Sequence, residues 1–187
     1  DLRNTQTQWV RRLSVDRRRA SLDPVTRLWN QRVGLELAAG TLAQAADENR
    51  SVGLGVLGLE FGMDVQPRQI DPTLRHAAEL LVSCLRSQDI VCRGDAAEFI
   101  VIVDGANQAR LRDVAKRFFL RLTEGRSEAA DQASYQLNFG GAVCGPGDGE
   151  SADVLLRRAR RALEAGRERG PKGIAIAGPR SEGAGRG

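Results

Sequence analysis

The sequence predicts an α+β fold with a ferredoxin-like βαββαβ core. Short apolar runs typical of strands alternate with segments in which apolar residues recur at helical spacing. Two of the strand-like runs, 90–94 and 99–103, lie close enough in the chain to form a hairpin. With this hairpin at the centre, the order is strand, helix, strand, strand, helix, strand. That order favours an antiparallel sheet with both crossover helices on one face.

The chain begins with a predicted signalling or stalk helix over residues 1–21. Its first 19 residues carry many arginines and only sparse apolar residues (Trp9, Val10 and Leu13), so this helix is too polar for a core position. Asp23-Pro24 marks a turn. The helix that follows is expected to run to about Glu48 as an element flanking the core.

The core elements follow in order from their patterns. Residues 52–61 form an apolar run bounded by polar residues, which predicts a buried strand. Helices are predicted from Asp71 to about residue 85 and over 107–123, because apolar residues repeat there at helical spacing. A strand at 134–143, a flanking helix at 151–166 and a last strand at 173–178 complete the domain.

Length and composition indicate one globular domain, which we expect over residues 22–178, with a disordered tail at 179–187. No apolar run approaches the roughly 20 residues that cross a bilayer. Three scattered cysteines without metal-type spacing favour reduced thiols and a cytoplasmic location. The pI is near 9.5, but only 4% of residues are aromatic, so platforms for stacking bases are scarce and no nucleic-acid partner is expected.

Five motifs in sequence order resemble those of the GGDEF (diguanylate cyclase) family. "LDPVTRLWNQR" is similar to the family pattern D-x-L-T-G-L-x-N-R, with Asp23, Thr26, Leu28 and Asn30 matching. "IDPTLRHAAELL", "LNFGGAV" and "LLRRARRALEAGRERG" stand where the patterns G-D-x-x-L-x-x-V-A, S-I-G-V-A and L-L-x-x-A-D-x-A-L-Y-x-A-K-x-x-G are expected. "DAAEF" occupies the signature turn of the hairpin. The resemblance spans residues 22–178 and implies a nucleotide-cyclase palm-like fold.

The resemblance also implies a chemistry that this sequence lacks residues to perform. Family members join two GTP molecules into cyclic di-GMP, which requires carboxylates for two divalent ions and glycines beside the phosphates. Here Gly58 aligns with the first metal-binding aspartate. The signature turn reads Asp95, Ala96, Ala97, Glu98 and Phe99, so that both glycines and the metal-binding acid are replaced. We therefore expect no catalytic residue, no metal site and no enzyme activity.

At other positions, some residues match the family pattern and others do not. Glu60 and Asp71 match a second carboxylate and the acid that reads guanine, whereas the phosphate-contacting lysine aligns with Gly166. Within the turn, the simplest interpretation of Glu98 is a solvated residue, and that of Phe99 is a core anchor. Arg93, in the hairpin, is expected on the strand surface.

A second site of the family is present in full. The family's product-inhibition motif, R-x-x-D, lies five residues before the signature turn, and Arg86 and Asp89 occur at this spacing. The resemblance places a third member of the site at Arg117, which lies off the apolar stripe of its helix. Arginine can bond guanine or phosphate through its planar fork, and aspartate can accept from the guanine edge. The alternative is that Arg86 and Asp89 form an ordinary surface ion pair, which contributes below about 1 kcal/mol.

The favoured function is therefore a cyclic di-GMP receptor that requires no cofactor and passes its signal to attached domains. A homodimer through the ligand or the N-terminal helix, and an upstream sensory or membrane domain, are the expected partners. Three alternatives stay open: a dimerisation or protein-interaction module without nucleotide, a GTP-binding regulatory domain, and residual cyclase activity.

Overall fold

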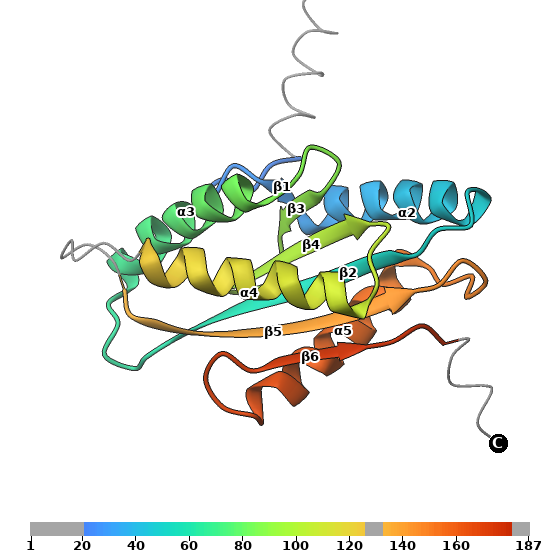
Figure 1. Ribbon diagram of the computed structural model, residues 1–187. Coiled ribbons are helices and arrows are strands. Elements are labelled where there is room, and N and C mark those ends of the chain that lie inside the picture. The colour runs from blue at the N-terminus through green and yellow to red at the C-terminus, as the bar shows by residue number, and fades with distance from the viewer. Residues whose placement is uncertain (1–20, 126–132, 181–187) are drawn as a thin grey trace, which may run out of the picture.

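A computed structural model describes residues 21–125 and 133–180 (Figure 1). The N-terminal helix predicted over residues 1–21 falls almost entirely outside these ranges. None of the helices in the described ranges combines the length and apolar character needed to cross a membrane.

The domain is built on one six-stranded sheet with the strand order β1-β3-β4-β2-β5-β6. Along the chain the elements are β1 (Trp29–Asn30), α2 (Gln31–Asp47), β2 (Val52–Phe61), α3 (Pro67–Cys84), β3 (Ile90–Arg93), β4 (Glu98–Asp104), α4 (Gln108–Glu124), β5 (Tyr135–Cys144), α5 (Ala152–Arg167) and β6 (Ile174–Ala177). The four central strands β3, β4, β2 and β5 pair with one another antiparallel, and the edge strands β1 and β6 pair parallel to β3 and β5. The predicted βαββαβ core is confirmed.

Helices cover both faces of the sheet. Strand residues alternate between faces, so odd-numbered positions of β2 and β4 face α3 and α4, and even-numbered positions face α2 and α5. Both crossover helices, α3 and α4, therefore pack on one face, as expected. The face with α2 and α5 is the one that will carry Glu98, because Glu98 has the same parity as Ile100 and Ile102.

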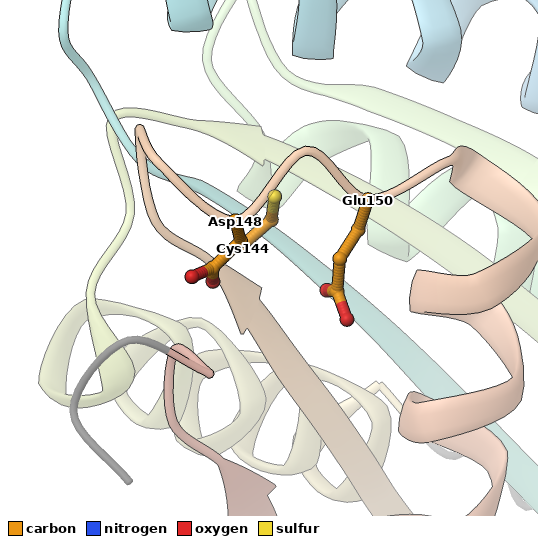
Figure 2. Close-up of side chains that lie close together, drawn as sticks. All are labelled: Cys144, Asp148 and Glu150. Carbon is orange, nitrogen blue, oxygen red and sulfur yellow. The ribbon is translucent and has the colours of Figure 1, made fainter. Parts of the chain in front are cut away.

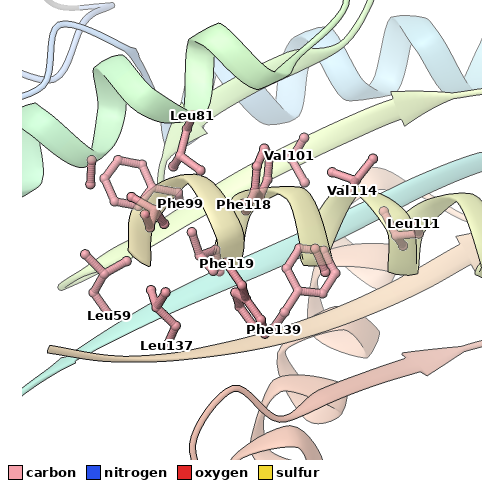
Figure 3. Close-up of a cluster of buried hydrophobic side chains, with 14 of the residues drawn as sticks. Leu59, Leu81, Phe99, Val101, Leu111, Val114, Phe118, Phe119, Leu137 and Phe139 are labelled. Atoms are coloured by element: carbon pink, nitrogen blue, oxygen red, sulfur yellow. The ribbon is translucent and has the colours of Figure 1, made fainter. Parts of the chain in front are cut away.

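The larger apolar cluster lies between the sheet and the pair α3–α4 (Figure 3). Phe99 of β4, Phe118 of α4 and Phe139 of β5 are fully buried there. Burying an aromatic side chain stabilises a fold by roughly 1.5–3 kcal/mol. The interpretation of Phe99 as a core anchor is confirmed. Because Phe99 is buried, it fixes the position of its neighbour Glu98.

The turn predicted at Asp23-Pro24 is confirmed. The helix that follows, α2, begins at Gln31, several residues after the turn. Asp23 Oδ1 accepts hydrogen bonds from the Thr26 backbone N–H (2.7 Å) and hydroxyl (2.8 Å), which closes a turn in place of a helical start. Asn30 then caps α2, because its side chain accepts from Val33 N at 3.0 Å.

One helix boundary differs from the prediction. Helix α3 starts at Pro67, before the predicted Asp71, because Gln66 and Gln69 form a capping box and proline is tolerated in a first turn. Arg180 lies in the segment 179–187 that was predicted as a disordered tail, and it has partners within the described ranges. Its backbone N–H donates to Asp148 Oδ2 at 3.0 Å, and its guanidinium pairs with Glu150 at 2.5 Å.

Candidate functional site

Arg86 and Asp89 lie in the short turn that joins α3 to β3. Arg86 N donates to Asp89 Oδ2 at 3.2 Å, and Asp89 N donates to Arg86 O at 3.1 Å. The Arg86 guanidinium is exposed and has no partner among the described residues. The other carboxylate oxygen, Asp89 Oδ1, is buried and makes no hydrogen bond within the described ranges. The turn thus holds the two predicted residues side by side without an ion pair between their side chains.

Arg117 lies on the exposed side of α4, as predicted. Helices α3 and α4 run side by side in opposite directions (Figure 1). The end of α4 is tied to the middle of α3, because Gly125 O lies 2.6 Å from His76 Nε2. Arg117 lies eight residues before Gly125, or about 12 Å back along α4. Because the two helices are antiparallel, Arg117 is level with the end of α3, eight residues after His76, that leads to Arg86. Within the described ranges Arg117 bonds to neither Arg86 nor Asp89.

The β3–β4 turn, residues 94–97, lies at the other end of β3. Gly94 N donates to Glu98 O and Glu98 N donates to Asp95 O, each at 2.9 Å, so the turn is tight. Ala96 has a φ of 45°, in the left-handed region that disfavours any residue with a Cβ. The family pattern that this turn resembles has glycine at this position, a residue that adopts a positive φ at no steric cost.

We predict that Ala96→Gly stabilises the domain by about 0.5–1 kcal/mol, because relief of the left-handed strain outweighs the added chain entropy. Urea unfolding measures the change. Ala97→Gly is the matched control, since Ala97 has no positive φ and should lose stability. A gain in Ala97→Gly equal to that in Ala96→Gly contradicts the prediction.

Arg160 of α5 reaches into the β3–β4 turn. Its guanidinium lies 2.8 Å from Asp95 Oδ2, 2.8 Å from Glu98 Oε2 and 2.9 Å from Gln31 Oε1. The Glu98 side chain is only 17% exposed. The interpretation of Glu98 as a solvated residue is therefore wrong, because its place on the α5 face brings it under Arg160.

Arg167, two helical turns further along α5, lies over the neighbouring part of β2. Its Nε lies 2.5 Å from Glu60 Oε1. A Cβ on Gly58 would lie 3.4 Å from its Nη2. Gly166 packs against the backbone at Gly173. The alignment of the family's lysine with Gly166 is off by one residue, because counting the family pattern from Leu155 places its aspartate at Arg160 and its lysine at Arg167.

Arg93 is not the strand-surface residue that was predicted. Its Nη1 donates to Glu98 O at 2.7 Å, its Nη2 donates to Ala96 O, and its guanidinium stacks 5.4 Å from the Phe99 ring centre. Burial lowers the pKa of Arg93, and surrounding carboxylates oppose that shift (Asp23, Glu98, Asp71 and Asp95). Arg93 therefore supports the turn from within.

A group of possible metal ligands lies at the end of β5 and in the loop that follows it (Figure 2). Ligand atoms of Cys144, Asp148 and Glu150 lie within 4.8 Å of one another. Glu150 faces two guanidinium groups, those of Arg158 and Arg180, each at 2.5 Å. Burial raises the pKa of the Cys144 thiol, which disfavours the thiolate that binds metals. The group is best described as an ion-paired anchor of this loop.

A cavity of about 630 Å³ lies between α2 and the same loop. Its lining is mostly apolar, and most of the charged residues that line it have partners in the protein. Arg32 pairs with Glu36 at 2.7 Å, and Arg50 pairs with Glu48 at 2.8 Å. The cavity touches neither the Arg86–Asp89 turn nor the β3–β4 turn, so it offers no chemistry to either site.

The chain was compared with known families and curated proteins. Residues 20–172 match the family described as "Diguanylate cyclase, GGDEF domain". The uncharacterized protein sll1895 of Synechocystis is 25% identical over 148 residues, a match that covers 77% of this chain and 21% of that protein. The chain thus spans about a fifth of the length of this curated relative.

Solved structures of similar fold support the architecture. The coiled coil and GGDEF domain of DgcB from Caulobacter crescentus, in complex with c-di-GMP, has a TM-score of 0.79 and 20% identity, covering 94% of this chain and 97% of that one. The FimX GGDEF domain from Pseudomonas aeruginosa has a TM-score of 0.73 and 21% identity, covering 82% and 98%. At these identities the likeness shows the fold alone.

Proposed function

The chain belongs to the GGDEF family, and we propose that it is a catalytically inactive member that binds cyclic di-GMP through Arg86, Asp89 and Arg117. The observation that carries the proposal is the turn formed by Arg86 and Asp89. It combines an exposed guanidinium that has no partner within residues 21–125 and 133–180 with a carboxylate that has an unused acceptor there. Buried polar atoms normally have partners, so Asp89 Oδ1 is a position where a donor is missing.

The geometry of the turn suits a guanine-containing ligand. One hydrogen bond from Arg86 N to Asp89 Oδ2 and one from Asp89 N to Arg86 O fix the aspartate, while the Arg86 side chain is exposed. Its planar fork can bond guanine O6 and N7 or a phosphate. Arg117, level with this end of α3, adds a second cation within reach of a ligand with two phosphates. The c-di-GMP in the DgcB structures belongs to those proteins, but a shared fold makes the same ligand a reasonable probe.

Loss of turnover is supported by the residues around the β3–β4 turn. Gly58 and Ala97 offer no carboxylate where the family binds its metal ions. Glu60 and Glu98 remain, but Arg167 and Arg160 pair with them. Asp95 adds an exposed acid where the family has glycine, beside the expected place of a triphosphate.

Isothermal titration of the protein with cyclic di-GMP and, separately, with GTP tests the proposed ligand. Binding of cyclic di-GMP alone is expected. Binding of GTP alone would favour a GTP-binding regulatory domain instead. Absence of binding by either would favour an interaction module that does not use nucleotides.

We predict that the purified protein forms no cyclic di-GMP from GTP with Mg²⁺ or Mn²⁺, because two metal-binding carboxylates are missing. Chromatographic product analysis checks this. Ala97→Asp should also be inactive, since Gly58 still lacks a side chain. Product that is lost in Glu98→Gln would contradict the assignment.

The predicted signalling helix over residues 1–21 gives a proposed route for output. We propose that ligand binding is passed through it to attached domains or to a second copy of the chain. Strand β1 pairs with β3, the strand that begins directly after Asp89, so the ligand site and the N-terminal segment are joined by one pair of strands.

A further inference from the structure

We propose that Arg160, a cation that the family pattern lacks, takes the place of a divalent ion of an active family member, beside Arg167, which stands where the family pattern has lysine. Arg160 makes the β3–β4 turn independent of metal and closed to metal–triphosphate complexes. The proposal rests on the proposed loss of turnover, but not on the binding of cyclic di-GMP.

The two arginines are placed to act together. They are seven residues apart on α5, so their side chains leave the same side of the helix. The sheet residues beneath them share one face as well. Gly58 and Glu60 are two apart on β2, and Gly58 lies directly opposite Glu98 of β4. One face of the sheet thus presents its remaining carboxylates to one face of α5.

Arg160 lies 2.8 Å from Glu98 and also holds Asp95. Arg167 is held less tightly: its Nε lies 2.5 Å from Glu60 Oε1 without hydrogen-bond geometry, and its Nη1 pairs with Glu164 of the same helix. The family pattern has a negatively charged aspartate at the position of Arg160, so the charge at this position is reversed in this chain. Compared with the family pattern, this chain lacks acids at Gly58, at Ala97 and on α5. It gains a positive charge, that of Arg160, in the same place.

Electrostatics explains why a guanidinium would exclude a metal ion. A divalent cation that bound Glu98 would lie within about 4–5 Å of the Arg160 charge, and this repulsion is strong where water is partly excluded. The Arg160 side chain is 30% exposed and that of Glu98 17%. The planar guanidinium of arginine can donate to several acceptors at once. Arg160 donates to Gln31 Oε1 as well as to the two carboxylates.

Thermal unfolding of the full chain with and without millimolar Mg²⁺ or Mn²⁺, at ionic strength matched with KCl, tests the proposal. The wild-type melting temperature should not respond to either ion. Arg160→Ala should melt roughly 4–8 °C lower, because two carboxylates lose their cation, and Mn²⁺ should restore at least half of that loss. Electron paramagnetic resonance measures the concentration of free Mn²⁺. This concentration should fall when the Arg160→Ala protein is added and should not fall when the wild type is added.

Arg161→Ala is the matched control, since Arg161 is exposed on the same helix and has no ion pair within the described ranges. Arg160→Lys, which keeps the charge but not the fork, should melt between the two proteins and stay insensitive to Mn²⁺. This variant keeps the test decisive if Arg160→Ala does not fold. Stabilisation of the wild type by Mn²⁺, or a loss in Arg160→Ala that Mn²⁺ does not reduce, would overturn the proposal.

Binding of cyclic di-GMP distinguishes this result from the proposed function. Arg160→Ala should bind the ligand within twofold of the wild type, because Arg160 contacts the β3–β4 turn, which lies at the opposite end of β3 from Asp89. If the wild type binds no cyclic di-GMP but the cation responses are as expected, the receptor function fails and the role of Arg160 stands.

Discussion

Arg86→Ala should lower the affinity of the domain for cyclic di-GMP at least tenfold in isothermal titration. The substitution removes an exposed guanidinium whose hydrogen bonds to a charged ligand contribute about 1.5–3 kcal/mol each. A loss of 1.4 kcal/mol corresponds to a factor of ten in the dissociation constant. The fold should not change, because the Arg86 side chain has no partner within the described part of the chain and the turn is closed by backbone groups.

Arg68→Ala provides the control, since Arg68 is an exposed arginine on α3 and lies at the opposite end of that helix from Arg86. It removes the same charge and should change affinity less than twofold at moderate salt. Arg93 would be an unsuitable control, because it supports the β3–β4 turn. Unchanged binding in both Arg86→Ala and Asp89→Ala would show that the ligand site lies elsewhere.

The sequence predicted the core of the fold because its periodicities are strong. Strand β2 has the predicted limits, and α4 begins and ends one residue from the prediction. The two-residue strand β1 was not predicted, since a pair of residues such as Trp29 and Asn30 has no period to detect. The late start of α2 depends on hydrogen bonds of Asp23, which compete locally with a helix.

The candidate site was predictable where it depends on local spacing. The turn formed by Arg86 and Asp89 follows from four consecutive residues, and its backbone bonds are local. Arg160 and Arg167 were missed because their partners are distant in sequence. Glu98 lies 62 positions before Arg160. Counting the family pattern residue by residue along α5 would have revealed the arginine in place of an aspartate.

Gly140→Ala should lower the free energy of unfolding by about 3 kcal/mol or more, at the upper end of the range for overpacked cores. Gly140 lies on β5 where α5 crosses the sheet. An added Cβ would lie 2.0 Å from Leu163 N and 2.3 Å from Ala159 O, which are backbone atoms that cannot turn away. The whole helix would have to shift.

A shift of α5 would also move Arg160 and Arg167 from their carboxylates, so Gly140→Ala should gain sensitivity to Mn²⁺ as Arg160→Ala does. The melting temperature should fall by roughly 6–12 °C. Gly40→Ala is the matched control, because a Cβ on Gly40 of α2 meets no atom within 4 Å, and alanine in a helix stabilises by about 0.5–1 kcal/mol. Equal stability of Gly140→Ala and the wild type would show that α5 can move away from β5 at little cost, and that the position of its arginines is not fixed by this contact.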